Sequence, residues 1–303
     1  MGVWHSLVIA LIISPHRSRR RHLCGFFVLH TINANPLLFF TMPVYNDKKL
    51  ERTETMLPLN LAHRGFSGMY PENTMLAFSK AVLEGRCDGL EIDVHFSKDG
   101  ELMVIHDCSL ERTTNGTGCV SDYTYDDLMH LDAGVKFDAR FAGERIPKLI
   151  QVLELVKNNS LMLNIELKNY ETEYPGMEQA IVLLIKKMGL EKQVFLSSFN
   201  HISIAECKRS YPEISAGILY HQPLFGAEKY CSTIGADAIH PHYRLLRYEK
   251  DLAERCHAAG LCVNTWTVNE ELDMENMITQ QVDSIITNFP NKLSKLLKER
   301  VHV

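Results

Sequence analysis

The sequence lacks several features that would each indicate a class of protein. It has no uninterrupted apolar run of the roughly 18–20 residues that a membrane-spanning helix needs. It has no basic surplus, since its formal net charge is −5, and a nucleic-acid partner is therefore not indicated. No CxxC pair occurs among its eight cysteines, which argues against a zinc ribbon or a thioredoxin-like redox site.

What remains is the composition of an ordinary globular protein. Of the 303 residues, 46% are hydrophobic and 23% are charged, a balance that excludes a disordered or fibrous chain. A chain of this length with its own apolar core needs no disulfide framework. We therefore expect the scattered cysteines to be reduced thiols and the protein to be cytoplasmic.

The first 57 residues differ from the rest and are expected to form an N-terminal extension. An apolar run at 8–13 precedes a basic cluster at 17–21, which is the reverse of the order in a secretory signal peptide. We interpret the segment as poorly structured, or as an over-long start with Met42 or Met56 as the initiator. The alternative takes 17–21 as the charged part and 23–29 as the apolar part of a targeting segment, which would make the protein exported or membrane-associated.

Residues 58–298 alternate short apolar runs with amphipathic segments. This alternation predicts parallel strands joined by outer helices. No Gly-x-Gly-x-x-Gly follows the first strand, so a doubly wound sheet is less favoured than a (β/α)8 TIM-like barrel. Eight candidate strands support the barrel, at 59–63, 89–96, 161–167, 194–199, 215–219, 238–240, 262–268 and 284–287. The run at 102–105 follows a tight turn and is expected to pair antiparallel with 89–96.

Acidic side chains occur within two of the predicted strands. Glu91 and Asp93 stand two residues apart and therefore point to the same face, and Glu166 lies on the next barrel strand. Three carboxylates aimed at one point repel one another unless a cation lies between them. Ion pairing with Arg or Lys is the alternative, but oxygen ligands inside a barrel favour a hard divalent ion, Mg²⁺ or Ca²⁺.

Other polar side chains lie at the ends of these strands. His63 and His106 suit proton transfer near neutral pH. Arg64 and Lys168 suit the binding of phosphate oxygens. Trp266 is either an apolar wall for the carbon atoms of a substrate or an ordinary core aromatic.

Several short motifs, taken together, resemble those of the glycerophosphodiester phosphodiesterase family over about residues 58–297. They are AHRG at 62–65, PENT at 71–74, LEIDV at 90–94, IHD at 105–107 and NIELK at 164–168, with SSF at 197–199, WTVN at 266–269 and ITN-P at 286–290. The resemblance implies a phospholipase-C-like barrel that hydrolyses a small-molecule glycerophosphodiester to sn-glycerol 3-phosphate and an alcohol.

The same resemblance implies roles for individual residues. It makes His63 and His106 the acid–base pair, and it makes Glu91, Asp93 and Glu166 the metal ligands. Arg64 and Lys168 would contact phosphate, and Glu72 and Asn73 would support the site, with Glu72 orienting Arg64.

A small insertion at about 108–145 would lie over the barrel mouth and shape the entrance for the alcohol, with Phe137 and Phe141 packing there.

Two other functions remain open from the sequence. One is a lysophospholipase D or phospholipase-C-like activity on a lipid phosphodiester. The other is binding of a phosphorylated ligand without catalysis.

Overall fold

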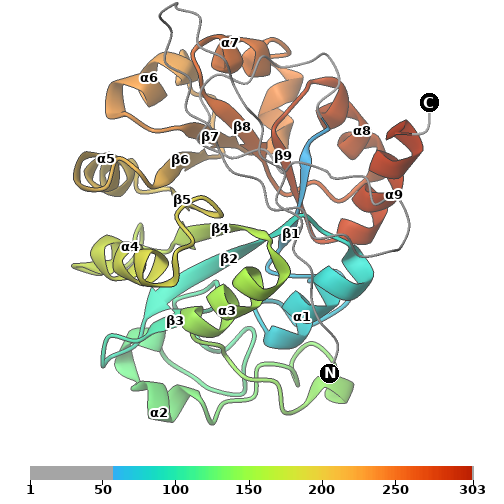
Figure 1. The fold of residues 1–303 in the computed structure, drawn as a ribbon. Helices are drawn as coiled ribbons and strands as arrows, with labels where there is room; N and C mark the ends of the chain where they lie inside the picture. Colours follow the sequence, from blue (N-terminus) through green and yellow to red (C-terminus); the bar gives the residue numbers. More distant parts are fainter. Residues whose placement is uncertain (1–56, 302–303) are drawn as a thin grey trace, which may run out of the picture. The chain divides into compact units, whose positions relative to one another are not determined.

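The computed structural model describes residues 57–301, so the expected extension at 1–57 lies outside the described residues except for Leu57. Eight parallel strands close into a ring in the order β1-β9-β8-β7-β6-β5-β4-β2, with β2 also pairing β1 (Figure 1). They are β1 Leu59–His63, β2 Gly89–Phe96, β4 Met162–Leu167, β5 Val194–Ser198, β6 Ser215–Tyr220, β7 Ala238–Pro241, β8 Cys262–Thr265 and β9 Ser284–Thr287. The predicted barrel is confirmed. The short strand β3, Leu102–Val104, pairs antiparallel with β2, also as predicted.

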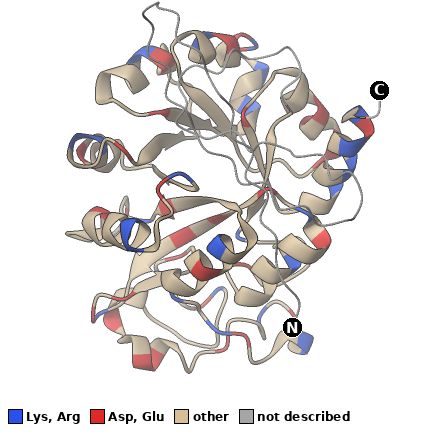
Figure 2. Cartoon of the chain, viewed as in Figure 1, with Lys and Arg blue, Asp and Glu red and all other residues tan. Residues whose placement is uncertain are grey.

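Helices connect the strands and surround the ring (Figure 1). They are α1 Met75–Lys80, α3 Leu149–Asn159, α4 Met177–Met188, α5 His201–Ser210, α6 Ala227–Ile234, α7 Leu252–Ala258, α8 Glu271–Thr279 and α9 Pro290–Val301. Lys and Arg are interspersed with Asp and Glu over these outer helices (Figure 2). No helix within residues 57–301 has both the length and the apolar character needed to cross a membrane.

The insertion between β3 and α3 is mostly loop. It contains the short helix α2, Tyr125–Leu128, and 3₁₀ turns at Val120–Asp122 and Ala139–Phe141. Phe141 packs against Phe137 and against Tyr70 of the β1–α1 loop, so both aromatic residues take part in packing there. The segment therefore attaches to the same end of the barrel as the loop that follows β1.

Helix α1 changes its geometry at its C-terminal end, and β8 is three residues shorter than the predicted strand. Helix α1 begins after Thr74, whose hydroxyl accepts from the Ala77 N–H, and it changes to a π-helical segment at Ala81–Gly85. Gly85 lies so close to Pro290 of α9 that an added Cβ would come within 2.7 Å of its ring. The strand expected at 262–268 ends at Thr265, and a 3₁₀ turn, Tyr243–Arg247, faces the residues that follow.

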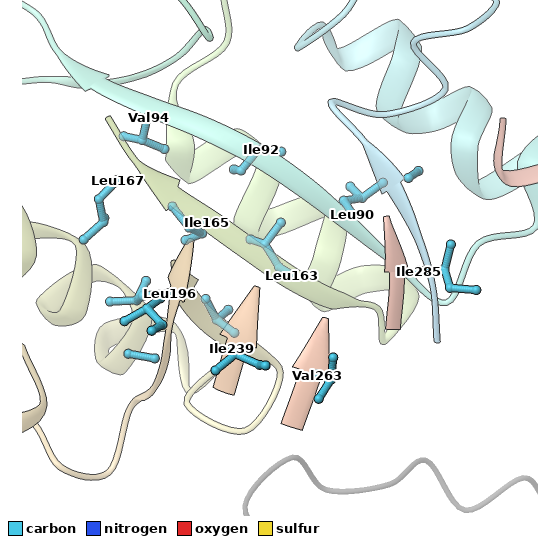
Figure 3. Packing of buried hydrophobic residues seen from close by; sticks show 14 of the residues in the cluster. Leu90, Ile92, Val94, Leu163, Ile165, Leu167, Leu196, Ile239, Val263 and Ile285 are labelled. Carbon is cyan, nitrogen blue, oxygen red and sulfur yellow. The ribbon is translucent and has the colours of Figure 1, made fainter. Parts of the chain in front are cut away.

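The main hydrophobic core lies between the strands and the helices. Outward-facing side chains of neighbouring strands line up because each strand alternates its two faces (Figure 3). Leu90, Ile92, Leu163 and Ile165 are fully buried in this layer. The inward faces carry a smaller apolar cluster together with the polar side chains described below.

We expect Leu163→Ala to lower the free energy of unfolding by about 2–5 kcal/mol, because it removes a fully buried side chain from this layer. The measurement is denaturant unfolding of the purified variant. Leu183→Ala on α4 is the matched control, since Leu183 is 54% exposed and its loss should change stability by less than about 0.5 kcal/mol. Equal losses for both variants would contradict this placement of the core.

Candidate active site

The strand register brings three acidic side chains together inside the barrel. Asp93 of β2 is paired with Glu166 of β4, and Glu91 lies two residues before Asp93 on the same face. One carboxylate oxygen from each lies within 4.8 Å of the other two. We call Glu91, Asp93 and Glu166 the acidic triad.

The protonation of the triad is strongly perturbed. Burial raises the pKa of Glu91 well above its ordinary value, and the neighbouring Asp93 and Glu166 add to this. Burial also raises the pKa of Glu166. Burial would raise the pKa of Asp93 too, but Arg64 and Lys168 hold it far below its usual range. The protein's own cations thus compensate only part of the negative charge collected here.

A tight turn at the end of β1 places Arg64 over the triad. Arg64 and Gly65 both have positive φ, +54° and +80°, and a Cβ on Gly65 would come within 2.7 Å of the Ala77 carbonyl carbon. The Arg64 N–H donates to the Glu91 carbonyl at 2.8 Å. Its side chain turns back so that Nε lies 3.3 Å from Asp93 Oδ2 and Nη1 donates to Glu72 Oε1 at 2.8 Å.

Asn73 and Lys168 hold Asp93 and Glu166 from two further sides. Asn73, itself at φ +55°, donates from Nδ2 to Asp93 Oδ2 at 2.9 Å. Lys168 Nζ donates to Glu166 Oε1 at 2.8 Å and lies 3.7 Å from Asp93 Oδ1. Asp93 Oδ1 is buried and accepts no hydrogen bond, so a strong acceptor stays available at the centre of the site.

Two histidines face the triad through the same ring atom. His63 Nε2 lies 3.8 Å from Glu91 Oε2, and His106 Nε2 lies 4.0 Å from Asp93 Oδ1. The opposite ring nitrogens are held by side chains to which the sequence assigned no role. His63 Nδ1 is 2.6 Å from Asn288 Oδ1, and His106 Nδ1 is 2.6 Å from Asp107 Oδ1.

The environment of His63 favours its neutral form. Burial, together with the neighbouring Arg64, lowers the pKa of His63 to about 3. Asn288 Oδ1, which also accepts from the Ser67 hydroxyl, accepts the Nδ1–H of the neutral ring. The lone pair of Nε2 then points at the site.

Trp266 stands apart from this cluster, directly after β8, which lies opposite β4 in the ring of strands. Its indole N–H donates to the His240 carbonyl at 2.7 Å, and its ring packs edge-on against Phe199 and His242. It is therefore part of an aromatic wall at the mouth.

Sequence reasoning missed Arg112, which belongs to the insertion and hydrogen-bonds to both Glu72 and Asp107. No spacing rule singles it out, because it reaches the site along an irregular loop.

Comparison with known proteins agrees with this geometry. Residues 63–292 match the Glycerophosphoryl diester phosphodiesterase family. A glycerophosphodiester phosphodiesterase from Caldanaerobacter subterraneus subsp. tengcongensis is 42% identical over 80% of this chain and 99% of its own. Another from Bacillus altitudinis is 42% identical over 78% of this chain and 97% of its own.

Among solved structures, a phosphodiesterase from Oleispira antarctica in complex with the product sn-glycerol-3-phosphate has a TM-score of 0.71 and 28% identity. The match covers 80% of this chain and 97% of that one. A family match over most of the barrel, together with relatives at 42% identity along almost their whole length, shows the relationship directly. The chain belongs to the glycerophosphoryl diester phosphodiesterase family.

Proposed function

We propose that this enzyme hydrolyses glycerophosphodiesters to sn-glycerol 3-phosphate and an alcohol, with one divalent metal ion and two histidines. The observation that carries the proposal is the acidic triad, flanked by two cations and faced by the Nε2 atoms of His63 and His106. The product complex of the Oleispira antarctica relative supports the substrate class.

The residues present fit a hard divalent ion. The triad offers only carboxylate oxygens, which suit Mg²⁺ or Ca²⁺, and Asp93 Oδ1 has no hydrogen-bond donor of its own. Like charges buried this close favour a bound cation. When bound, such an ion supplies positive charge that polarises the phosphoryl group.

Arg64 and Lys168 bind the non-bridging phosphate oxygens in this proposal. Both already lie within 4 Å of Asp93, at the centre of the site, so a phosphate there would meet their N–H groups. They stabilise charge that develops on the phosphoryl oxygens during transfer. Glu72 keeps the Arg64 fork directed inward by accepting its Nη1–H.

The two histidines divide the proton transfers according to what holds their Nδ1 atoms. His63 is neutral with a free Nε2 lone pair, and it takes the proton from the attacking oxygen, which is water or the glycerol 2-hydroxyl. Asp107 holds His106 through Nδ1 and leaves Nε2 facing the site, and from that position His106 protonates the leaving alcohol. Lys168 Nζ lies 3.2 Å from His106 Nε2, so the proposed phosphate-binding cation and the proposed proton donor lie side by side.

Trp266 and the neighbouring Phe199 form the wall against which the glycerol carbons pack. The insertion at about 108–145 shapes the entrance for the alcohol.

We further propose that 58–298 is the catalytic barrel, that 1–57 is an extension to it, and that the protein is cytoplasmic. The buried free thiols Cys87, Cys207, Cys231 and Cys256 support the location, because such thiols persist in a reducing compartment.

The deciding test is release of glycerol 3-phosphate from glycerophosphocholine by the purified full chain. We expect activity to disappear in EDTA and to return with added Mg²⁺ or Ca²⁺, because the triad needs a cation to bind the phosphodiester. Full activity after exhaustive chelation would contradict a metal site. No turnover of any glycerophosphodiester by the folded, metal-loaded protein would favour a lipid phosphodiester or a binding role.

A further inference from the structure

One guanidinium in the insertion binds two carboxylates at once. Arg112 Nη1 and Nη2 donate to the two oxygens of Glu72, each at 2.8 Å. Its Nε and Nη2 donate to the two oxygens of Asp107 at 2.5 and 3.1 Å. Both pairs are bidentate, an arrangement that fixes the plane of each carboxylate as well as its position.

Each of these carboxylates also holds a residue of the proposed reaction. Glu72 accepts from Arg64, and Asp107 is paired with His106 Nδ1. The five side chains therefore form one line of alternating charge, Arg64–Glu72–Arg112–Asp107–His106, with Arg112 at its centre. The line joins the proposed phosphate-binding group after β1 to the proposed acid after β3.

Arg112 lowers the pKa of both carboxylates in this line. Burial would raise the pKa of Asp107, but hydrogen bonds from Arg112 and His106 bring it down to about 2. The pKa of Glu72 is likewise lowered by Arg112 and Arg64 against the effect of burial. Both carboxylates are thus ionised at neutral pH and are full acceptors for the groups they orient.

A purely stabilising role explains this arrangement poorly. The Arg112 side chain is 45% exposed, and ion pairs that water reaches this easily contribute little to folding. The backbone here is anchored by its neighbours instead. Leu110 and Thr114 are fully buried, and the Thr114 hydroxyl donates to the Leu110 carbonyl at 2.7 Å.

We propose that Arg112 is a positioning residue, which holds Asp107 and Glu72 so that His106 and Arg64 keep their orientation toward the substrate. The proposal rests on the proposed function, because it gives Arg112 its effect through those two residues. It also assigns the start of the insertion a part in catalysis beyond shaping the entrance.

The test compares Arg112→Ala with wild type in the glycerophosphocholine assay at saturating metal. We expect kcat to fall by about 10- to 100-fold, the range for a reacting group displaced by a fraction of an ångström to an ångström. The melting temperature should change little. Added guanidinium, at concentrations too low to unfold the protein, should restore part of the lost kcat, while Arg112→Lys should restore little, because a point charge cannot serve two forks.

Two further variants separate the possible outcomes. Arg209→Ala is the matched control, since Arg209 lies on the outer helix α5 and pairs with Glu206 while its side chain is 75% exposed; its kcat should stay at the wild-type value. On an Asp107→Asn background, adding Arg112→Ala should cost much less than it does in wild type. Active wild type, inactive His106→Ala and an unchanged Arg112→Ala would overturn this inference alone, whereas inactive wild type would overturn the proposed function.

Discussion

His106→Ala is expected to lower kcat for glycerophosphocholine by about 10²- to 10⁴-fold, the usual contribution of a general acid or base. The ring faces Asp93 with Nε2 and is held by Asp107 through Nδ1, so its loss removes the proton donor without opening the core. The same range is expected for His63→Ala. Both are measured as release of glycerol 3-phosphate with saturating metal, after the melting temperature has shown that each variant is folded.

A change of leaving group distinguishes the role of His106 from that of His63. A substrate whose alcohol is replaced by p-nitrophenol needs little protonation on departure, so it should recover much of the activity of His106→Ala and little of that of His63→Ala. His130→Ala is the control, because His130 is an exposed histidine of the insertion, and it should keep wild-type kcat. Wild-type kcat in His106→Ala, or equal recovery of both variants, would contradict the assignment of acid and base.

The barrel could be predicted because its strands carry a periodic signal. Strands β1, β2 and β9 begin and end at the predicted residues, since a strand of a closed parallel barrel must bury its outward face along its whole length. The insertion offers no such period. Its loops are held by single polar groups, such as Asp132, whose carboxylate accepts from the N–H groups of Gly134, Val135 and Gly143. Sequence spacing does not predict hydrogen bonds between a side chain and the backbone of an irregular loop.

The residues of the candidate site likewise fall into those whose place the sequence predicts and those whose place it does not. The triad could be predicted because strand alternation and the parallel register together require Glu91, Asp93 and Glu166 to face one point. The side chains that orient the histidines could not be assigned roles from the sequence. Asn288 meets His63 across 225 positions of sequence, and the role of Arg112 depends on where an irregular loop turns back.

The metal site gives the second large expected effect. At a Mg²⁺ or Ca²⁺ concentration of 100 times Kd, wild type should gain about 2.7 kcal/mol of stability, because the ion binds the folded triad and not the unfolded chain. For a barrel of this size that corresponds to a rise in melting temperature of roughly 5–10 °C. Glu91→Gln should lose most of this rise, since it removes one of the three carboxylates. Thermal unfolding in EDTA and after metal addition measures both quantities.

Without metal, the melting temperature of Glu91→Gln should not fall below that of wild type. Burial, together with Asp93 and Glu166, disfavours the charged form of Glu91 in the folded protein, and a neutral amide at this position avoids that cost. Glu91→Gln in EDTA should therefore melt at or above the wild-type temperature, while keeping an oxygen that accepts the Arg64 N–H. Glu271→Gln, at an exposed acid on α8, should leave both temperatures unchanged. A variant that is less stable in EDTA yet gains the full metal shift would show that Glu91 supports the fold and does not bind the ion.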